Sequence, residues 1–289
     1  MLYGTKLNKA YNDKNPENQL YIPDQYTEDP FGQLEWLEQE LSECRLDGKK
    51  VYITGHHPPV SQSVIVKAGD DLWKEGFKLR FEKIVSDYSD VVSGMLFGHV
   101  HTNELRRMPH MPSSAAPLML QGAVAPGYCM DPNFSIVKYN SRTKAPTDVS
   151  KYFAKVEEAY QMNSSVLTWN EEIKSTLDLL GMESFTNEAV QSLANRAMGD
   201  EALWSLYWNM FTKGRPQEVD CTGDCIHQEA CVIACGSSKK LWYSCEIGYG
   251  DCLVGGIKDL DEDLSDNWQM TEDYEGYENI TVDDDGEVV

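Results

Sequence analysis

Two short histidine motifs constrain the fold of this chain more than any other feature. Residues 55–59 read GHHPP and directly follow a short buried-strand pattern at 51–54, and residues 98–101 read GHVH and follow a strand pattern that ends at Phe97. Helical periodicity between the motifs predicts an amphipathic helix over 72–88. Parallel strands joined in this way have their carboxyl ends at one edge of a sheet, where open α/β folds bind ligands. We therefore expect four of the six histidines to gather at that edge.

The rest of the first 145 residues continues this alternation of helix and strand. Apolar side chains recur at helical spacing after Asp29, which predicts a helix that ends near residue 47. Further strands are predicted at 94–97, 118–120 and 134–137. Strand–helix–strand order of this kind predicts an α/β layer with a largely parallel sheet.

After about residue 150 the pattern changes to helices only. They are predicted over 150–162, 169–180, 186–198 and 200–211. A cysteine-rich segment and an acidic end follow, in which 13 acidic and no basic side chains lie between residues 259 and 287. We read that end as a disordered, solubilising tail rather than a calcium-binding or partner-docking segment, because no EF-hand spacing is present. The predicted division is 1–149, 150–257 and 258–289.

The charge balance excludes one class of partner. Acidic side chains outnumber basic ones by 47 to 25, a net charge of −22, whereas binding to nucleic acid depends on basic patches. No stretch is apolar for long enough to cross a bilayer. The first residues also contain no apolar core of a signal peptide.

Cysteine usage nevertheless points to an exported protein. Six of the eight cysteines lie between Cys221 and Cys252. Such density is typical of a disulfide-stapled segment, and a zinc knot is the alternative, although only His227 lies near enough to join it. Three glycosylation sequons, at Asn133, Asn163 and Asn279, are consistent with export.

The histidine motifs indicate a metal site. Imidazole is the most common metal ligand among side chains, and the glycines before His56 and His99 allow the backbone to approach closely. The rings of His99 and His101 are two residues apart, so they could reach one metal ion or two adjacent ones.

Taken together, the motifs resemble those of acid sphingomyelinases and acid sphingomyelinase-like phosphodiesterases, within the calcineurin-like metallophosphoesterases. The resemblance is carried by DPFGQLEWL at 29–37, VYITGHHPP at 51–59, FGHVHTNE at 97–104, and WSLY with NMFTKG over 204–214. It covers roughly residues 1 to 255. It implies an α/β fold in which part of a calcineurin-like metallophosphoesterase sheet layer precedes a helical, disulfide-rich C-terminal lobe, and it places residues 1–149 in the C-terminal half of that phosphoesterase domain.

The resemblance also implies a chemistry. In that family two Zn²⁺ ions take part in hydrolysis of a small-molecule or lipid phosphodiester, and the proteins are secreted or lysosomal. By motif match, His56 and His99 would bind one zinc and His101 the other. Glu104 matches an acidic position near the site without an assigned role, and His57 falls where the family varies, so it is not counted as a ligand. Family likeness also favours a Cys221–Cys225 disulfide.

Departures from the family pattern limit this assignment. Neither Asp-x-His nor Gly-Asn-His occurs in the chain, so the sequence identifies no bridging carboxylate and no proton donor, and the catalytic residue is unknown. We therefore expect a phosphodiesterase scaffold that is incomplete as given and nearly inactive alone. Two alternatives stay open, a non-catalytic remnant or binding module, and a phosphomonoesterase like the purple acid phosphatases, which share Gly-His-x-His.

Overall fold

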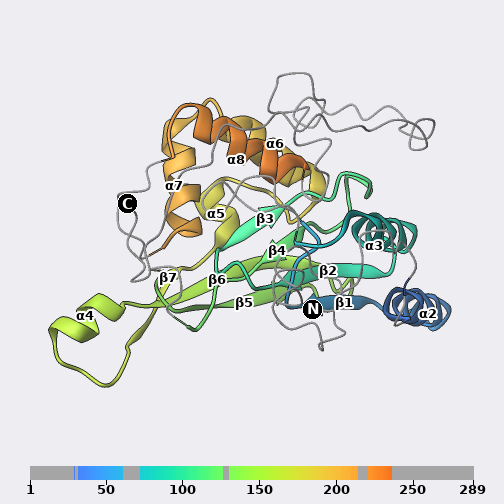
Figure 1. The fold of residues 1–289 in the computed structure, drawn as a ribbon, viewed down its shortest axis with the longest axis horizontal. Helices are drawn as coiled ribbons and strands as arrows, with labels where there is room; N and C mark the ends of the chain where they lie inside the picture. Colours follow the sequence, from blue (N-terminus) through green and yellow to red (C-terminus); the bar gives the residue numbers. More distant parts are fainter. Residues whose placement is uncertain (1–28, 30–31, 61–71, 126–129, 214–220, 236–289) are drawn as a thin grey trace, which may run out of the picture. The chain divides into compact units, whose positions relative to one another are not determined.

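A computed structural model describes residue 29 and residues 32–60, 72–125, 130–213 and 221–235 (Figure 1). All of them belong to one compact unit, and they form two β-sheets with seven helices. No helix in this part of the chain is both long and apolar enough to cross a bilayer. The predicted tail lies outside the described residues.

The first sheet is the predicted α/β layer. It has the order β1-β2-β4-β3, with β1 at Val51–Gly55, β2 at Val92–Phe97, β3 at Glu104–Arg106 and β4 at Leu118–Leu120. Strands β1, β2 and β4 run parallel, and β3 is antiparallel to β4. Their carboxyl ends are in register, since Gly55 pairs with Phe97 and Phe97 with Leu120. The strands predicted at 51–54, 94–97 and 118–120 and the largely parallel arrangement are confirmed, whereas the strand predicted at 134–137 belongs to a different sheet.

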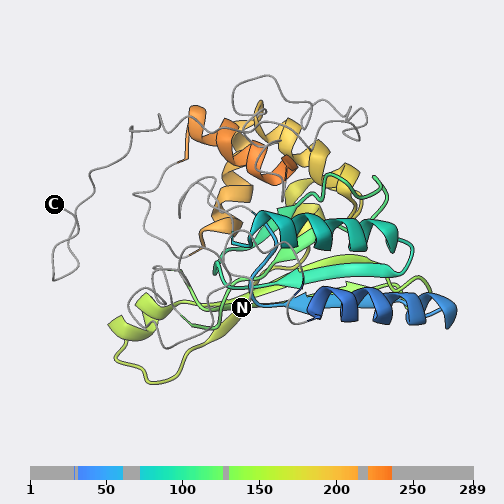
Figure 2. The same ribbon diagram turned by 45° about the vertical axis from the view of Figure 1, so that its right-hand side comes forward.

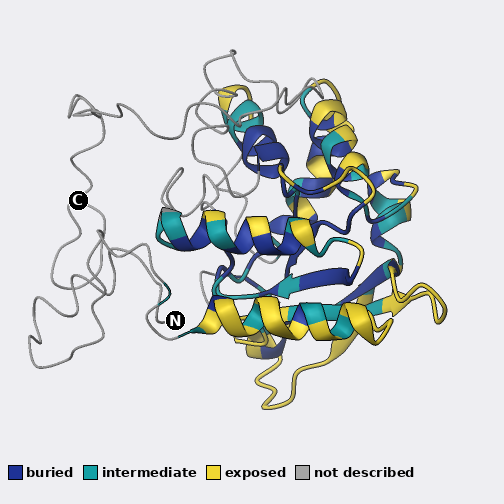
Figure 3. Ribbon diagram, turned by 90° about the vertical axis from the view of Figure 1, so that its right-hand side faces the viewer, coloured by how far each residue is buried: buried dark blue, intermediate teal, exposed yellow. Residues whose placement is uncertain are grey.

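Both helices expected in this layer are present. Helix α2 spans Gln33–Leu46 and α3 spans Glu75–Asp87. The Asp29 carboxylate accepts hydrogen bonds from the first amides of α2, at Leu34 and Glu35, as an acidic residue at a helix start should. Figure 3 shows the outer face of α2 exposed, and its buried residues are Leu34 and Leu41, which lie two turns apart on one face.

A second, antiparallel sheet corrects the expectation of helices only after residue 150. Its strands are β5 at Asn133–Tyr139, β6 at Pro146–Ala154 and β7 at Trp169–Ile173, in that order. The helices predicted over 150–162 and 169–180 are therefore wrong at their beginnings, and only α4 at Val156–Gln161 and α5 at Thr176–Leu180 are helical.

The reason lies in the side chains of β6. Val149 and Phe153 are buried, and valine, tyrosine and phenylalanine favour a pleated surface more than a helix. The expected boundary between residues 149 and 150 falls inside this strand. The sequon asparagine Asn133 is only 2% exposed at the start of β5, so this fold buries the side chain that a glycan would need.

The C-terminal helices pack beside β3. Helix α6 spans Asn187–Ala197, α7 spans Glu201–Phe211 and α8 spans Asp224–Cys235, and Figures 1 and 2 show them together on the side of the unit away from α2. The first two confirm predicted helices, whereas α8 was read only as a cysteine-rich segment. The Cys221–Cys225 disulfide lies at the start of α8, and Cys231 within it is also disulfide-bonded, which favours disulfides over a zinc knot.

Candidate metal centre

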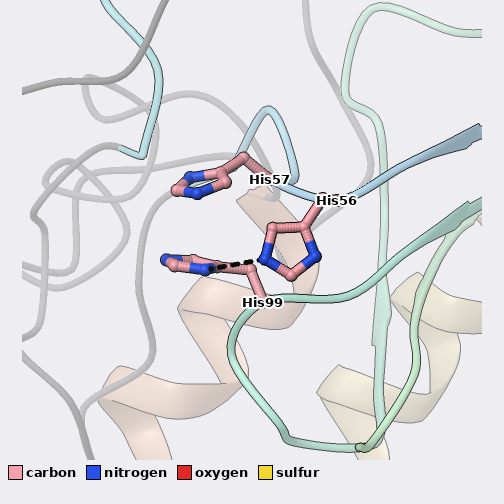
Figure 4. Close-up of side chains that lie close together, drawn as sticks. All are labelled: His56, His57 and His99. Carbon is pink, nitrogen blue, oxygen red and sulfur yellow. Dashed lines mark hydrogen bonds between the residues drawn. The ribbon is translucent and has the colours of Figure 1, made fainter. Parts of the chain in front are cut away.

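The ends of β1 and β2 bring the two histidine motifs together. The backbone amide of Gly98 donates a hydrogen bond of 3.0 Å to the carbonyl of His56, which joins the two loops. Beyond that contact, Nδ1 of His99 lies 3.3 Å from Nε2 of His56 (Figure 4). The predicted meeting of His56 with His99 at one sheet edge is therefore present.

A third imidazole, which sequence reasoning set aside, belongs to the same group. The ring of His57 stacks on that of His99, with 3.6 Å between centroids and 23° between planes. Its backbone carbonyl accepts a 3.0 Å hydrogen bond from the Trp73 indole, which fixes the loop. Figure 4 shows the three rings facing one space, and one ligand atom from each of His56, His57 and His99 lies within 4.8 Å of the others.

His101 lies outside this three-histidine group. Its backbone φ is 62° and that of His99 is 75°, in the left-handed region that side chains other than glycine rarely adopt. Residues held in that region cost about 1–3 kcal/mol each and concentrate at functional sites. The backbone strain thus falls on both histidines of the predicted Gly-His-x-His motif, while the role of His101 at a second metal stays a prediction.

The surroundings keep two of the imidazoles neutral. Burial, followed by the neighbouring His99 and His56, lowers the pKa of His57 to about 4. Burial also lowers the pKa of His99, with smaller contributions from His56 and His101. At neutral pH these rings are therefore unprotonated, as a metal ligand must be.

The residues present fit a zinc ion. Two imidazole nitrogens on a tetrahedral zinc are about 3.3 Å apart, given Zn–N bonds of about 2.0–2.1 Å, and this matches the His56–His99 separation. Nδ1 of His57 is buried and has no hydrogen-bond partner among the described residues, which is costly unless something else satisfies it. The donors are all imidazoles, which suit zinc.

A buried ion network anchors the far end of the His99 loop. The Glu104 carboxylate accepts hydrogen bonds from the Thr102 hydroxyl and from Nε of Arg106, the latter at 2.6 Å. Arg106 also lies 3.9 Å from a carboxylate oxygen of Glu229 on α8, and Glu104, Arg106 and Glu229 are at most 2% exposed. Glu104, which had no assigned role, therefore connects the loop to the C-terminal helices.

A lysine from the second sheet supports the same loop. Nζ of the fully buried Lys151 donates to the Asn103 amide oxygen at 3.0 Å and to the Ser135 hydroxyl at 3.1 Å. Burial lowers the pKa of Lys151 to about 7. Strand β6 thus contacts the segment that carries the histidines.

An apolar cleft adjoins the three-histidine group. It has a volume of about 140 Å³ and runs from His56 and His57 between β1, α2 and the start of α3. Trp36, Trp73 and Phe81 are among its lining residues. The three-histidine group therefore borders a surface suited to an apolar group.

Comparison with known proteins supports the reading of the motifs. No protein-family profile matches the chain. It is 29% identical over 63% of its length to a sphingomyelinase phosphodiesterase D of Dictyostelium discoideum, and 25% identical over 78% to a human cyclic GMP-AMP phosphodiesterase. It is 24% identical over 71% to the human sphingomyelin phosphodiesterase. The chain resembles the acid sphingomyelinases.

That resemblance, predicted from the motifs, is confirmed by these relatives, and by a human acid sphingomyelinase-like phosphodiesterase 3b at 25% identity over 71% of the chain. The sphingomyelinase-like chain spans 42% of the Dictyostelium protein, 49% of the human cyclic GMP-AMP phosphodiesterase and 31% of the human sphingomyelin phosphodiesterase. It therefore spans about half the length, or less, of the curated relatives it matches. The similar proteins are named as phosphodiesterases.

Proposed function

We propose that the sphingomyelinase-like chain carries the histidine side of a zinc-dependent site for hydrolysis of a phosphodiester. The observation that carries this proposal is the meeting of His56 with His99 at the carboxyl ends of β1 and β2. Similarity to proteins named as sphingomyelin and cyclic GMP-AMP phosphodiesterases supports the reaction class.

Each of these residues would have a separate role. His56 and His99 would hold one zinc, and by family likeness His101 would contribute to a second, for which the chain contains no Asp-x-His or Gly-Asn-His donor motif. Zinc, when bound, polarises a phosphoryl oxygen and lowers the pKa of a water molecule. The network of Glu104 and Arg106 fixes the backbone that presents His99, and the apolar cleft beside His56 receives an apolar part of the substrate.

The substrate proposed is a small-molecule or lipid phosphodiester. The cleft beside the histidines is lined by tryptophan and phenylalanine side chains, which suit an acyl chain or the flat face of a base. We also propose a secreted or lysosomal location, supported by the Cys221–Cys225 disulfide, because such bonds persist in oxidising compartments.

A zinc-dependent hydrolysis assay tests the proposal. The substrate is bis(4-nitrophenyl) phosphate, whose leaving group departs without a protein proton donor. We expect slow turnover above the buffer rate that is lost in His56→Ala and in His99→Ala and kept in His110→Ala. Because a general acid contributes about 10²–10⁴-fold, diesters with an alkoxide leaving group should react slower by that factor. No turnover by the zinc-loaded chain would refute the proposal.

The same assay separates the alternatives. Preference for 4-nitrophenyl phosphate over the diester would favour a phosphomonoesterase like the purple acid phosphatases. Zinc binding without turnover on either substrate would favour the non-catalytic remnant or binding module. One observation favours this non-catalytic alternative: the three-histidine group contains imidazoles alone and no carboxylate.

A further inference from the structure

We propose that His57 is a direct zinc ligand, so that His56, His57 and His99 form a single three-histidine site with one position left open. This inference concerns metal binding by the chain and does not depend on turnover. It differs from the ligand set implied by the motif resemblance, in which His57 has no part.

Geometry is the first support. Nε2 of His56 and Nδ1 of His99 are already as far apart as two ligands of a tetrahedral zinc, and a ligand atom of His57 lies within 4.8 Å of both. Closing the last gap takes rotation of the His57 ring out of its stack on His99 so that the lone pairs converge. The loops themselves are already held, by the hydrogen bond from the Gly98 amide to the His56 carbonyl and by the one from the Trp73 indole to the His57 carbonyl.

The burial of His57 is the second support. Its Nδ1 atom is shielded from solvent and finds no hydrogen bond among the described residues. A buried polar atom without a partner costs about 1–3 kcal/mol. Binding a metal ion would satisfy this buried nitrogen. The stabilisation would therefore be larger than for an exposed imidazole nitrogen, which water already satisfies.

Chemistry is the third support. The chain contains neither Asp-x-His nor Gly-Asn-His, so these two motifs contribute no metal ligands here. A zinc held by three protein ligands with an open fourth position is the common arrangement of catalytic zinc sites. The second histidine of GHHPP supplies the third donor here, and one bound zinc per chain is the expected stoichiometry.

Competition between the 289-residue chain and a chromophoric chelator for Zn²⁺ tests this assignment, with calorimetry to count the bound ions. We expect one tight zinc per chain. In His57→Ala its affinity falls by more than about 100-fold, because even the loss of an outer-sphere partner costs about 10–100-fold. In the remote control His110→Ala the affinity changes less than about threefold. In His101→Ala, which removes a predicted ligand of a second ion and lies outside the three-histidine group, the affinity for this one tight zinc stays within the same range.

Two further measurements keep the result interpretable. Circular dichroism and thermal melts of the metal-free variants verify that His57→Ala is folded. Co²⁺ replacing Zn²⁺ should give the intense visible absorption of a tetrahedral site in the wild type, and the band should weaken and shift in His57→Ala.

The outcomes are distinct. Wild-type affinity in a folded His57→Ala variant, or an affinity lost in His101→Ala instead, would overturn the assignment. Absence of any zinc binding by the chain would overturn it as well. Failure of the hydrolysis assay alone, with tight binding that depends on His57, would count against the proposed function and leave this site in place.

Discussion

Replacement of Arg106 by methionine should destabilise the chain severely, because this guanidinium holds two buried carboxylates. The side chains of Arg106 and Glu104 are each 1% exposed, and that of Glu229 is 0% exposed. Breaking a buried pair by removing one partner typically costs about 3–5 kcal/mol, because it leaves an uncompensated charge in the interior. Here the loss affects two carboxylates, so we expect the upper part of this range.

Urea denaturation followed by circular dichroism measures the effect. With an m value of about 2–3 kcal/mol per molar and a loss of about 4–5 kcal/mol, the midpoint of Arg106→Met should fall by about 1.3–2.5 M. Removing the charge of one carboxylate as well, in Arg106→Met with Glu104→Gln, should recover part of the loss. The control is Arg45→Met at an exposed pair with Asp90, which should cost less than about 1 kcal/mol.

A midpoint for Arg106→Met close to that of the Arg45→Met control would contradict this expectation. Such a result would mean that water reaches the network or that the carboxylates are protonated. Coupling between the C-terminal helices and the histidine loop through Glu104 would then have no energetic basis.

Three further predictions follow from single contacts. Gly55→Ala would put a Cβ 2.5 Å from the Phe97 ring, so we expect a loss of about 1–3 kcal/mol in urea; an unchanged midpoint would contradict the packing. Burial lowers the pKa of Lys151 in the folded chain to about 7, below its value in the unfolded chain. The free energy of unfolding should therefore rise between pH 7 and pH 10, by up to about 1.4 kcal/mol per pH unit. A similar slope in Lys151→Met would contradict this. Replacing Cys221 and Cys225 by serine should cost about 2 kcal/mol in thermal melts, from the entropy of a short loop.

The parts of the fold that sequence predicts are those with strong local periodicity. The strands β1 and β2 and the helices α2 and α3 follow from the spacing of apolar residues, and the positions of His56 and His99 follow from strand order alone. In each case the local pattern and the tertiary packing agree.

Strand β5 was predicted at 134–137, but its partners β6 and β7 and the third histidine did not follow from the sequence. The apolar residues of β6 fit either a helix or a strand, and pairing with β5 and β7 decides between them. The stack of His57 on His99 depends on the turn that the loop makes after β1, and the spacing of residues in the sequence does not predict that turn. The sequence feature that points to a third ligand is the second histidine of GHHPP, His57.

X-ray absorption spectroscopy at the zinc edge of the zinc-loaded chain reports on the ligands of the three-histidine site themselves. We expect three imidazole nitrogens and one oxygen ligand in the open position, with Zn–N distances of about 2.0–2.1 Å, and a loss of one imidazole in His57→Ala. Sulfur scattering at about 2.3 Å would place the zinc in the cysteine segment instead and contradict the three-histidine site.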